Sequence, residues 1–189
     1  HREGTALPAD HLFRTERVKS FQLDRGFPLC RAHNPRWAFL PLSGAGASMA
    51  GGRFNRIGVP ALYLSFDEAT SAAEYRQDND IADPYTMVAY ISALPDLYDL
   101  RQLDGTWDPL WHDWNCDWRQ LYVDGIEPPS WILGDILLEM DKPGLIFPSI
   151  VNPSGTNVVL FTDRLTPDML SVHDPLGLLP ADQQSWPSR

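Results

Sequence analysis

The apolar segments of this chain are short, and they do not alternate regularly between strand and helix patterns. They predict one strand, a helix, further strands, a second helix and closing strands. A doubly wound parallel sheet requires repeated strand–helix–strand units, which this order lacks. We therefore expect an α+β fold with a bent or split mixed sheet flanked by helices, with strands over residues 61–65, 86–93, 97–100, 145–151, 157–161 and 169–173.

The composition sets the scale of this fold. The 189 residues include 17 prolines and 13 glycines, so long loops are expected between short elements. Hydrophobic residues make up 43% of the chain, which is enough for a sizeable core, and the length suits one domain with extensions. We expect an N-terminal extension over residues 1–27, a domain over residues 28–176 and a tail over residues 177–189.

Charge and cysteine content narrow the class of protein. A net charge of −10 lacks the basic field on which phosphate-backbone binding depends, so no direct nucleic-acid partner is expected, although a basic protein partner is compatible with it. No apolar run is long enough to span a membrane, and the first ten residues carry no secretion signal pattern. Cys30 and Cys116 are too few for a disulfide framework. These features predict a cytoplasmic protein with two free thiols.

The strand over residues 61–65 leads directly into a predicted helix. Its side chains alternate between two faces, with Leu62 and Leu64 on one and Ala61, Tyr63 and Ser65 on the other. Ser65 and Glu68 fit a capping box at the helix start. A stripe of small residues then allows this helix to approach its neighbour closely: Ala69, Ala72 and Ala73. Glu74 lies about 100° around the helix from the last of these, where a cleft could reach it.

Residues 43–60 are expected to form a loop, because six glycine and proline positions interrupt them. Gly44 and Gly46 begin a pattern like a dinucleotide-binding fingerprint. The third position of that fingerprint is Met49, however, and no P-loop motif is present. The glycines therefore indicate a loop whose backbone approaches something closely.

The other predicted elements are less distinctive. Four tryptophans at helical spacing predict one helical face, which forms either core or a protein contact: Trp107, Trp111, Trp114 and Trp118. A second helix is predicted over residues 131–140, with inward-facing Ile132, Leu133, Ile136, Leu137 and Met140. Residues 10–17 could form a short helix, and residues 36–42 at most an edge strand, because a proline interrupts them.

Two motifs that could carry chemistry have simpler explanations. His112 and Cys116 are four residues apart, but two ligands do not make a zinc site and the other histidines show no ligand spacing, so no metal is expected. Ser149 lies in F-P-S-I rather than in the G-x-S-x-G of serine hydrolases. A turn serine that caps nearby backbone explains it.

Four side chains suggest chemistry only when they are taken together. Arg31 and Arg53 suit the bidentate recognition of phosphates. Tyr63 can stack on a flat heterocycle, and Glu74 can stabilise a cationic sugar. Two phosphate clamps, an aromatic ring and one carboxylate are what cleavage of a nicotinamide–ribose bond requires.

The chain also resembles the RES-domain toxins. Matching segments occur in order from about residue 31 to residue 161: Arg31 in LCRAH, GGRFN at 51–55, PALYLS with Tyr63, Glu74 in SAAEY, WILGD at 131–135, GLIFPS at 144–149 and NVVLF at 157–161. Phe54 stands where the family more often has Trp, and residues 93–128 are longer than the family pattern.

The resemblance implies a fold similar to the ADP-ribosyltransferases of the diphtheria-toxin kind, and NAD⁺ as the substrate that is consumed. It also implies a toxin of a type II toxin–antitoxin system, whose partner is a cognate antitoxin with an Xre-type DNA-binding module. The residues expected to contact NAD⁺ are Arg31, Arg53, Tyr63, Ser149 and Asn157, the last of which could instead hold a loop. Those expected to take part in cleavage are Glu74, Arg31, Tyr63 and Ser149.

Three functions are compatible with these residues. The first is NAD⁺ cleavage at the nicotinamide–ribose bond, with water or phosphate as acceptor. The second is mono-ADP-ribosylation of a specific protein acceptor, which would yield a labelled protein from labelled NAD⁺. The third is a non-catalytic module that binds nucleotides or a partner through the tryptophan face, and that would bind NAD⁺ without releasing nicotinamide.

Overall fold

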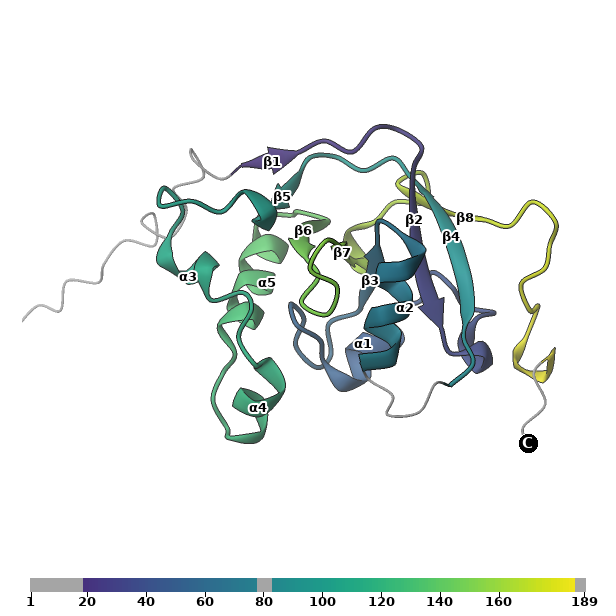
Figure 1. Ribbon diagram of the computed structural model, residues 1–189, viewed down its shortest axis with the longest axis horizontal. Coiled ribbons are helices and arrows are strands. Elements are labelled where there is room, and N and C mark those ends of the chain that lie inside the picture. The colour runs from purple at the N-terminus through teal and green to yellow at the C-terminus, as the bar shows by residue number, and fades with distance from the viewer. Residues whose placement is uncertain (1–18, 78–82, 186–189) are drawn as a thin grey trace, which may run out of the picture.

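One curved sheet organises the described part of the chain (Figure 1). The computed structural model describes residues 19–77 and 83–185, and the short helix expected over residues 10–17 lies outside them. The sheet has eight strands in the order β1-β5-β6-β7-β3-β2-β4-β8. Their bounds are β1 Ser20–Phe21, β2 Phe27–His33, β3 Ala61–Ser65, β4 Thr86–Ser92, β5 Leu97–Asp99, β6 Gly144–Pro148, β7 Thr156–Phe161 and β8 Leu170–His173.

This sheet is mixed, and it is split near its middle. β5 and β6 pair in parallel, whereas the other neighbouring strands pair antiparallel. β2 pairs with β4, and β3 with β7, along their whole lengths, but β2 and β3 pair only at Cys30 and Ser65. Beyond that pair the two strands no longer form a ladder. The predicted α+β fold with a bent or split mixed sheet is therefore confirmed.

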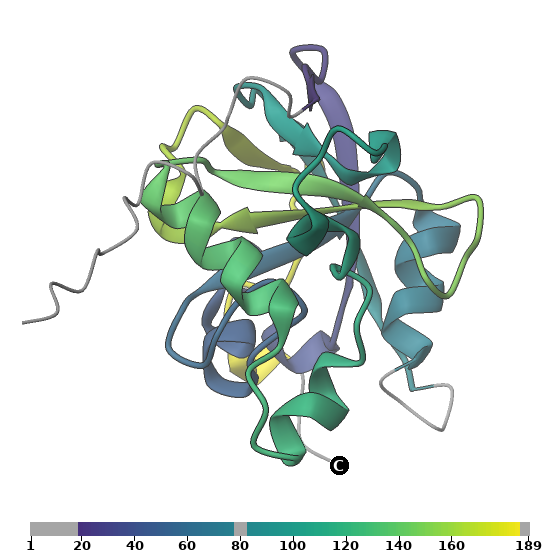
Figure 2. The same cartoon turned by 90° about the vertical axis from the view of Figure 1, so that its left-hand side faces the viewer.

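Five α-helices of the described residues accompany the sheet. They are α1 Ala45–Ala50, α2 Glu68–Gln77, α3 Pro109–His112, α4 Trp118–Val123 and α5 Pro129–Glu139. Short 3-10 helices cover Pro35–Trp37, Leu100–Gln102, Thr162–Arg164 and Gln183–Ser185. Figure 2 shows α5 running along one face of the sheet, with α4 beyond its lower end. Among the described residues, no helix has the length and apolar character needed to cross a membrane.

β3 has a hydrophobic cluster on each face, as its alternating sequence predicts. Leu62 and Leu64 are buried in one cluster, together with side chains of β4 and β8. Ala61 and Tyr63 belong to the other, which contains α5 side chains and three tryptophans. Because apolar area buried on both faces stabilises β3, this strand is a firm support for any side chain that projects from its end.

α5 buries a narrower face than its sequence predicts. Leu133 and Leu137 are fully buried, whereas the other three residues expected to face inward are partly exposed: Ile132, Ile136 and Met140. At Gly134 the helix touches the carbonyl oxygen of Phe54, and a Cβ there would overlap that oxygen. The helix therefore packs against the segment that follows Gly51 and Gly52.

Residues 43–60 contain α1, so the expectation of an uninterrupted loop was wrong. A Cβ on Gly44 would lie 2.6 Å from the backbone nitrogen of Ala61. This close approach to β3 is a tertiary contact, and it supports a helix whose glycine content predicted a loop. The edge strand expected over residues 36–42 is also absent from the described structure, since a 3-10 helix and turns take its place.

α2 begins near the expected position, but the predicted capping box was wrong. The backbone N–H and the hydroxyl of Thr70 both donate to the carboxylate of Asp67, each at 2.7 Å. Ser65 remains in β3, where its hydroxyl donates to Asn157. The buried side of the helix is also not the alanine stripe, since it consists of Thr70, Ser71 and Ala72 while Ala69 is exposed and Ala73 partly exposed.

The four spaced tryptophans do not lie on one helix. α3 ends at His112, and α4 begins only at Trp118. Asp108 and Asp117 each accept a hydrogen bond from a helical N–H, and such caps start new helices rather than extend one. All four tryptophans are nonetheless buried, three of them in the cluster beside α5. Of the two predicted roles, core or protein contact, Trp107, Trp111 and Trp114 therefore have the core role.

Candidate active site

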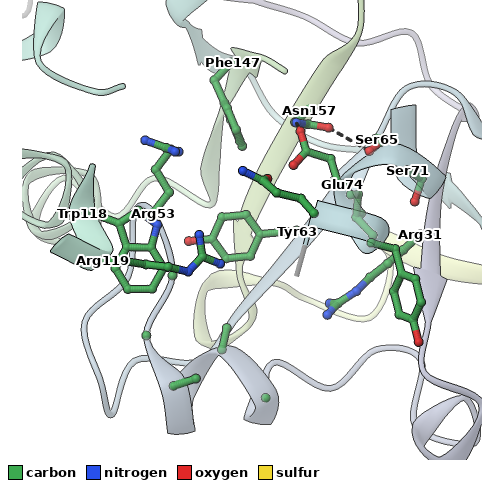
Figure 3. A pocket seen from close by; sticks show the side chains of 18 of the residues that line it. Arg31, Arg53, Tyr63, Ser65, Ser71, Glu74, Trp118, Arg119, Phe147 and Asn157 are labelled. Carbon is green, nitrogen blue, oxygen red and sulfur yellow. Dashed lines mark hydrogen bonds between the residues drawn. The ribbon is translucent and has the colours of Figure 1, made fainter. Parts of the chain in front are cut away.

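A cavity of about 680 Å³ lies where β2 and β3 diverge (Figure 3). β2, β3 and α2 line one part of it, and α1, Gly51, Gly52 and α4 line another. Phe147 of β6 and Asn157 of β7 complete the lining. This volume is in the range of sites for small molecules and cofactors. Its charged lining comprises three arginines near one carboxylate: Arg31, Arg53, Arg119 and Glu74. The cavity is therefore cationic although the chain carries a net charge of −10.

Glu74 projects from α2 and is held through one carboxylate oxygen. Ser149 Oγ donates to Glu74 Oε1 at 2.7 Å, and Asn157 Nδ2 donates to the same oxygen at 2.6 Å. Within residues 19–77 and 83–185, no hydrogen bond reaches Oε2. The two donors orient the carboxylate and leave its second oxygen able to accept a hydrogen bond from a ligand.

Ser149 and Asn157 are fixed in turn by the backbone and by β3. Ser149 Oγ accepts a hydrogen bond from the backbone N–H of Asn152 at 3.0 Å. Asn157 Oδ1 accepts one from the Ser65 hydroxyl at 2.8 Å. Asn157 lines the cavity, but Ser149 does not. This placement favours a positioning role for Ser149 through Glu74, rather than the direct ligand contact expected from the resemblance.

Arg31 projects from β2 toward the middle of the cavity (Figure 3). Burial of the guanidinium lowers its pKa from the ordinary value, because desolvation disfavours the charged form. Among the described residues, none accepts a hydrogen bond from it or forms an ion pair with it. A partly desolvated cation that faces a cavity in this way suits an anionic ligand, as the sequence predicts.

Arg53 also lines the cavity, but it is not beside Arg31. Its Nη1 donates to the carbonyl oxygens of Trp114 at 3.2 Å and Cys116 at 2.8 Å, and the guanidinium lies 5.9 Å from the Trp114 ring centroid. Figure 3 shows Arg31 and Arg53 on opposite sides of Tyr63. One end of Arg53 is thus used to hold the segment before α4, so it does not form the paired clamp with Arg31 that the sequence suggested.

Tyr63 presents its ring to the cavity while its hydroxyl is buried beneath it. The hydroxyl accepts a hydrogen bond from the Phe54 N–H at 2.9 Å and donates one to Asn55 Oδ1 at 2.8 Å. Burial raises the pKa of this phenol well above its ordinary value, so it stays neutral. The Asn55 amide donates to the Ala47 carbonyl of α1 and to two backbone carbonyls of the loop that follows, so helix, loop and ring are fixed as one unit.

Gly52 is required for that unit to pack. A Cβ at this position would lie 2.6 Å from the Tyr63 hydroxyl and would overlap Asn55 Oδ1. We expect Gly52→Ala to destabilise the fold by about 1–3 kcal/mol, the usual cost of overpacking. The measurement is thermal unfolding, with Tm lowered by about 2–4 °C per kcal/mol.

Gly46→Ala is the matched control for Gly52→Ala. Gly46 lies within α1, and a Cβ there would meet no atom within 4 Å. Alanine in a helix is favoured over glycine by about 0.5–1 kcal/mol, so Tm should stay level or rise. Equal Tm values for the two variants would contradict the packing argument.

α4 supplies cavity residues that were not predicted as site residues, although Trp118 belongs to the tryptophan face noted in the sequence. Trp118, Arg119, Tyr122 and Val123 all line the cavity. The only sequence signal was the cap at Asp117 followed by an aromatic and a basic residue, which is too general to identify a site. These residues line the cavity because Arg53 and the ring of Trp131 hold α4 and the segment before it against the loop that contains Gly51 and Gly52.

His33 lies next to Arg31 on the same strand and is kept neutral. Tyr90 donates its hydroxyl proton to the Pro41 carbonyl at 2.7 Å, so His33 Nε2 donates to the Tyr90 oxygen at 2.6 Å. Burial, together with the charge of Arg31, lowers the pKa of His33 to about 3. A neutral imidazole here adds no charge to the cavity wall.

The lowered pKa of His33 predicts a pH dependence of stability. The unfolded chain takes up the proton near pH 6.5 and the folded chain only near pH 3, so this stabilisation is complete above pH 6.5 and is lost as the pH falls between these values. We expect wild-type stability to fall more steeply than that of His33→Gln in this window, by up to about 1.4 kcal/mol per pH unit. Denaturant titrations at several pH values measure the difference, and parallel profiles would exclude it.

Neither cysteine nor histidine forms a metal site in the described residues. No group of three or more candidate ligands occurs there. His112 contacts the carbonyl oxygen of Asp104, and Cys116 donates to Ser130 Oγ at 3.5 Å, so the two do not share a ligand position. Both cysteines are free thiols, as predicted.

Comparisons with known proteins identify the fold and the family of the chain. The crystal structure of the MbcT–MbcA toxin–antitoxin complex of M. tuberculosis contains a similar fold, with a TM-score of 0.58 and 17% sequence identity over 82% of this chain and 84% of that chain. No curated protein sequence matches the chain. The model of the RES domain matches residues 28–187, which include every residue that lines the cavity. The chain therefore belongs to the RES-domain family.

Proposed function

We propose that this protein consumes NAD⁺ by cleaving the bond between nicotinamide and ribose. The observation that carries the proposal is the state of Glu74, whose Oε1 accepts two hydrogen bonds while Oε2 accepts none from the described residues. Glu74 is the carboxylate of a cavity whose other charged lining residues are arginines, and a carboxylate held in this way can stabilise positive charge that develops in a transition state.

The chemistry requires little acid catalysis. The C1′–N bond breaks heterolytically, its electron pair stays on the nicotinamide nitrogen, and the pyridinium leaves as a neutral base. Positive charge then develops on the ribose as an oxocarbenium-like species, which Glu74 stabilises. Water or phosphate attacks C1′, and an attacking water loses a proton to solvent.

The neighbouring residues divide the remaining tasks. Arg31 binds the diphosphate as a desolvated, bidentate cation, and the ring of Tyr63 packs on the nicotinamide. Ser149 and Asn157 position Glu74 through their hydrogen bonds to Oε1. Arg53 supports the cavity wall through the Trp114 and Cys116 carbonyls and adds positive potential.

We further propose that this enzyme is the toxin of a type II toxin–antitoxin system in the cytoplasm. Family membership supports this, together with the likeness to a fold found in a toxin–antitoxin complex. The partner would be a cognate antitoxin with an Xre-type module that blocks the active site. Induced expression without a partner should arrest growth, and expression of Glu74→Gln should not.

Product analysis tests the proposed reaction directly. The purified protein is mixed with NAD⁺ with and without inorganic phosphate, and the products are separated by chromatography. Nicotinamide should appear in both, with ADP-ribose or its 1″-phosphate as the second product. Binding of NAD⁺ without nicotinamide release would overturn the enzyme proposal, and a labelled protein band from labelled NAD⁺ in lysate would indicate transfer to a protein instead.

A further inference from the structure

We propose that α4 forms the subsite for the adenine nucleotide half of the substrate, with Arg119 binding its phosphate and Tyr122 stacking on the base. This inference rests on the proposed function, because that function makes the substrate a dinucleotide. α4 lies within residues 93–128, which are longer than the family pattern seen in the sequence, although the RES domain match spans them.

The cavity has two chemically different sides. Glu74 and Asn157 lie at one side, and Arg119 and Trp118 at the other, with Tyr63 between them (Figure 3). With Glu74 at the reacting ribose and Arg31 at the diphosphate, the side of the cavity beyond Tyr63 is left for the adenine nucleotide half, and α4 forms that side (Figure 3). The cavity volume of about 680 Å³ is large enough to hold more than the nicotinamide–ribose half.

Arg119 and Tyr122 have the chemistry for an adenine nucleotide. The guanidinium of Arg119 lies 4.7 Å from the Trp118 ring centroid, a cation–π contact that restricts its position. A planar guanidinium held in this way suits bidentate binding of phosphate oxygens. Tyr122 contacts the ring of Trp131 and is 49% exposed, so part of its ring remains accessible for stacking on a base.

The position of α4 is fixed by the same residues that shape the reacting end. Trp131 contacts the rings of Trp118 and Tyr122, and its Nε1–H donates to the Gly52 carbonyl at 2.7 Å. Arg53 joins the glycine loop to the Trp114–Cys116 segment that precedes α4. The reacting end and the α4 end of the cavity both contact the loop that contains Gly52, and this loop sets the distance between them.

Two half-substrates separate the two ends in an experiment. ADP carries the adenine nucleotide and a diphosphate, and nicotinamide mononucleotide carries the other half. Binding of each is measured by calorimetry for the wild type, Arg119→Ala and Tyr122→Ala. We expect each substitution to weaken ADP binding by about tenfold or more, as loss of a charge-assisted hydrogen bond or of a stacked ring implies, and to change binding of nicotinamide mononucleotide less than twofold.

Three further variants sharpen the result. Gln120→Ala changes an exposed residue of the same helix that does not line the cavity, so ADP binding should match the wild type. Tyr122→Phe keeps the ring and should also keep ADP binding. Arg119→Lys keeps the charge but loses the planar fork, so its ADP affinity should fall between those of the wild type and Arg119→Ala.

The outcomes for the subsite and for the enzyme are distinguishable. Equal ADP affinity of the wild type and Arg119→Ala would overturn the subsite, as would the absence of ADP binding in a protein that cleaves NAD⁺. If the wild type releases no nicotinamide but binds ADP through Arg119, the nucleotide subsite stands and the proposed reaction fails.

Discussion

Glu74→Gln is expected to lower the rate of nicotinamide release from NAD⁺ by about 10²–10³-fold, because the charge that stabilises the cationic ribose is removed. The loss should appear in kcat, since this interaction strengthens in the transition state. The fold should be preserved. Both Ser149 and Asn157 donate to Oε1, and the amide oxygen of Gln can accept the same two hydrogen bonds.

Two variants control for effects other than charge. Glu68→Gln makes the same change on the same helix at an exposed residue outside the cavity, and it should leave kcat within experimental error of the wild type. Ser149→Ala removes one of the two donors to Glu74, so it should lower kcat less than Glu74→Gln does. Wild-type kcat in Glu74→Gln, with an unchanged melting temperature, would remove Glu74 from the mechanism.

The second large effect is expected for Arg31→Ala. A hydrogen bond to a charged group contributes about 1.5–3 kcal/mol, so loss of this guanidinium should raise KM for NAD⁺ by about 10- to 150-fold. Stability should be unchanged or higher, because no described residue pairs with the desolvated cation. The combination of weaker binding with an undiminished Tm distinguishes a ligand-binding arginine from a structural one.

Arg36 provides the matched control for Arg31. It is exposed and does not line the cavity, so Arg36→Ala should leave KM unchanged. Arg31→Lys keeps the charge without the bidentate fork and should give an intermediate KM. An unaltered KM for Arg31→Ala would contradict the phosphate-binding role.

Much of the sheet could be predicted from local sequence. The alternation of Leu62 and Leu64 with Tyr63 predicted a strand with two distinct faces, and both faces carry the expected side chains. Side-chain direction along a strand has a period of two, so four or five residues are enough to specify it. β7 was recognised for a different reason, because residues 157–161 form a short, nearly continuous apolar run.

The errors occurred where tertiary contacts outweigh local preference. α1 forms in a glycine-rich segment because its backbone packs closely on β3 at Gly44. The tryptophans at 107–118 keep helical spacing, but Trp111 lies in α3, Trp118 in α4 and the other two in turns or bends, since aspartate caps start two separate short helices. Burial of an indole ring can be satisfied by either arrangement, so spacing alone could not distinguish them.

The sequence by itself indicated which side chains could do chemistry, and it placed Tyr63 on a strand and Glu74 on the helix that follows. The strand β2, which carries Arg31, was not among the predicted strands and is known only from the structure. Only the tertiary structure decided how these side chains meet. It joins β2 to β3 at a single residue pair, turns one end of Arg53 toward two backbone carbonyls, and brings α4 to the cavity wall. The physical reason is that the residue period of a strand or helix is local, whereas a hydrogen bond between residues sixty or more positions apart depends on how whole elements pack.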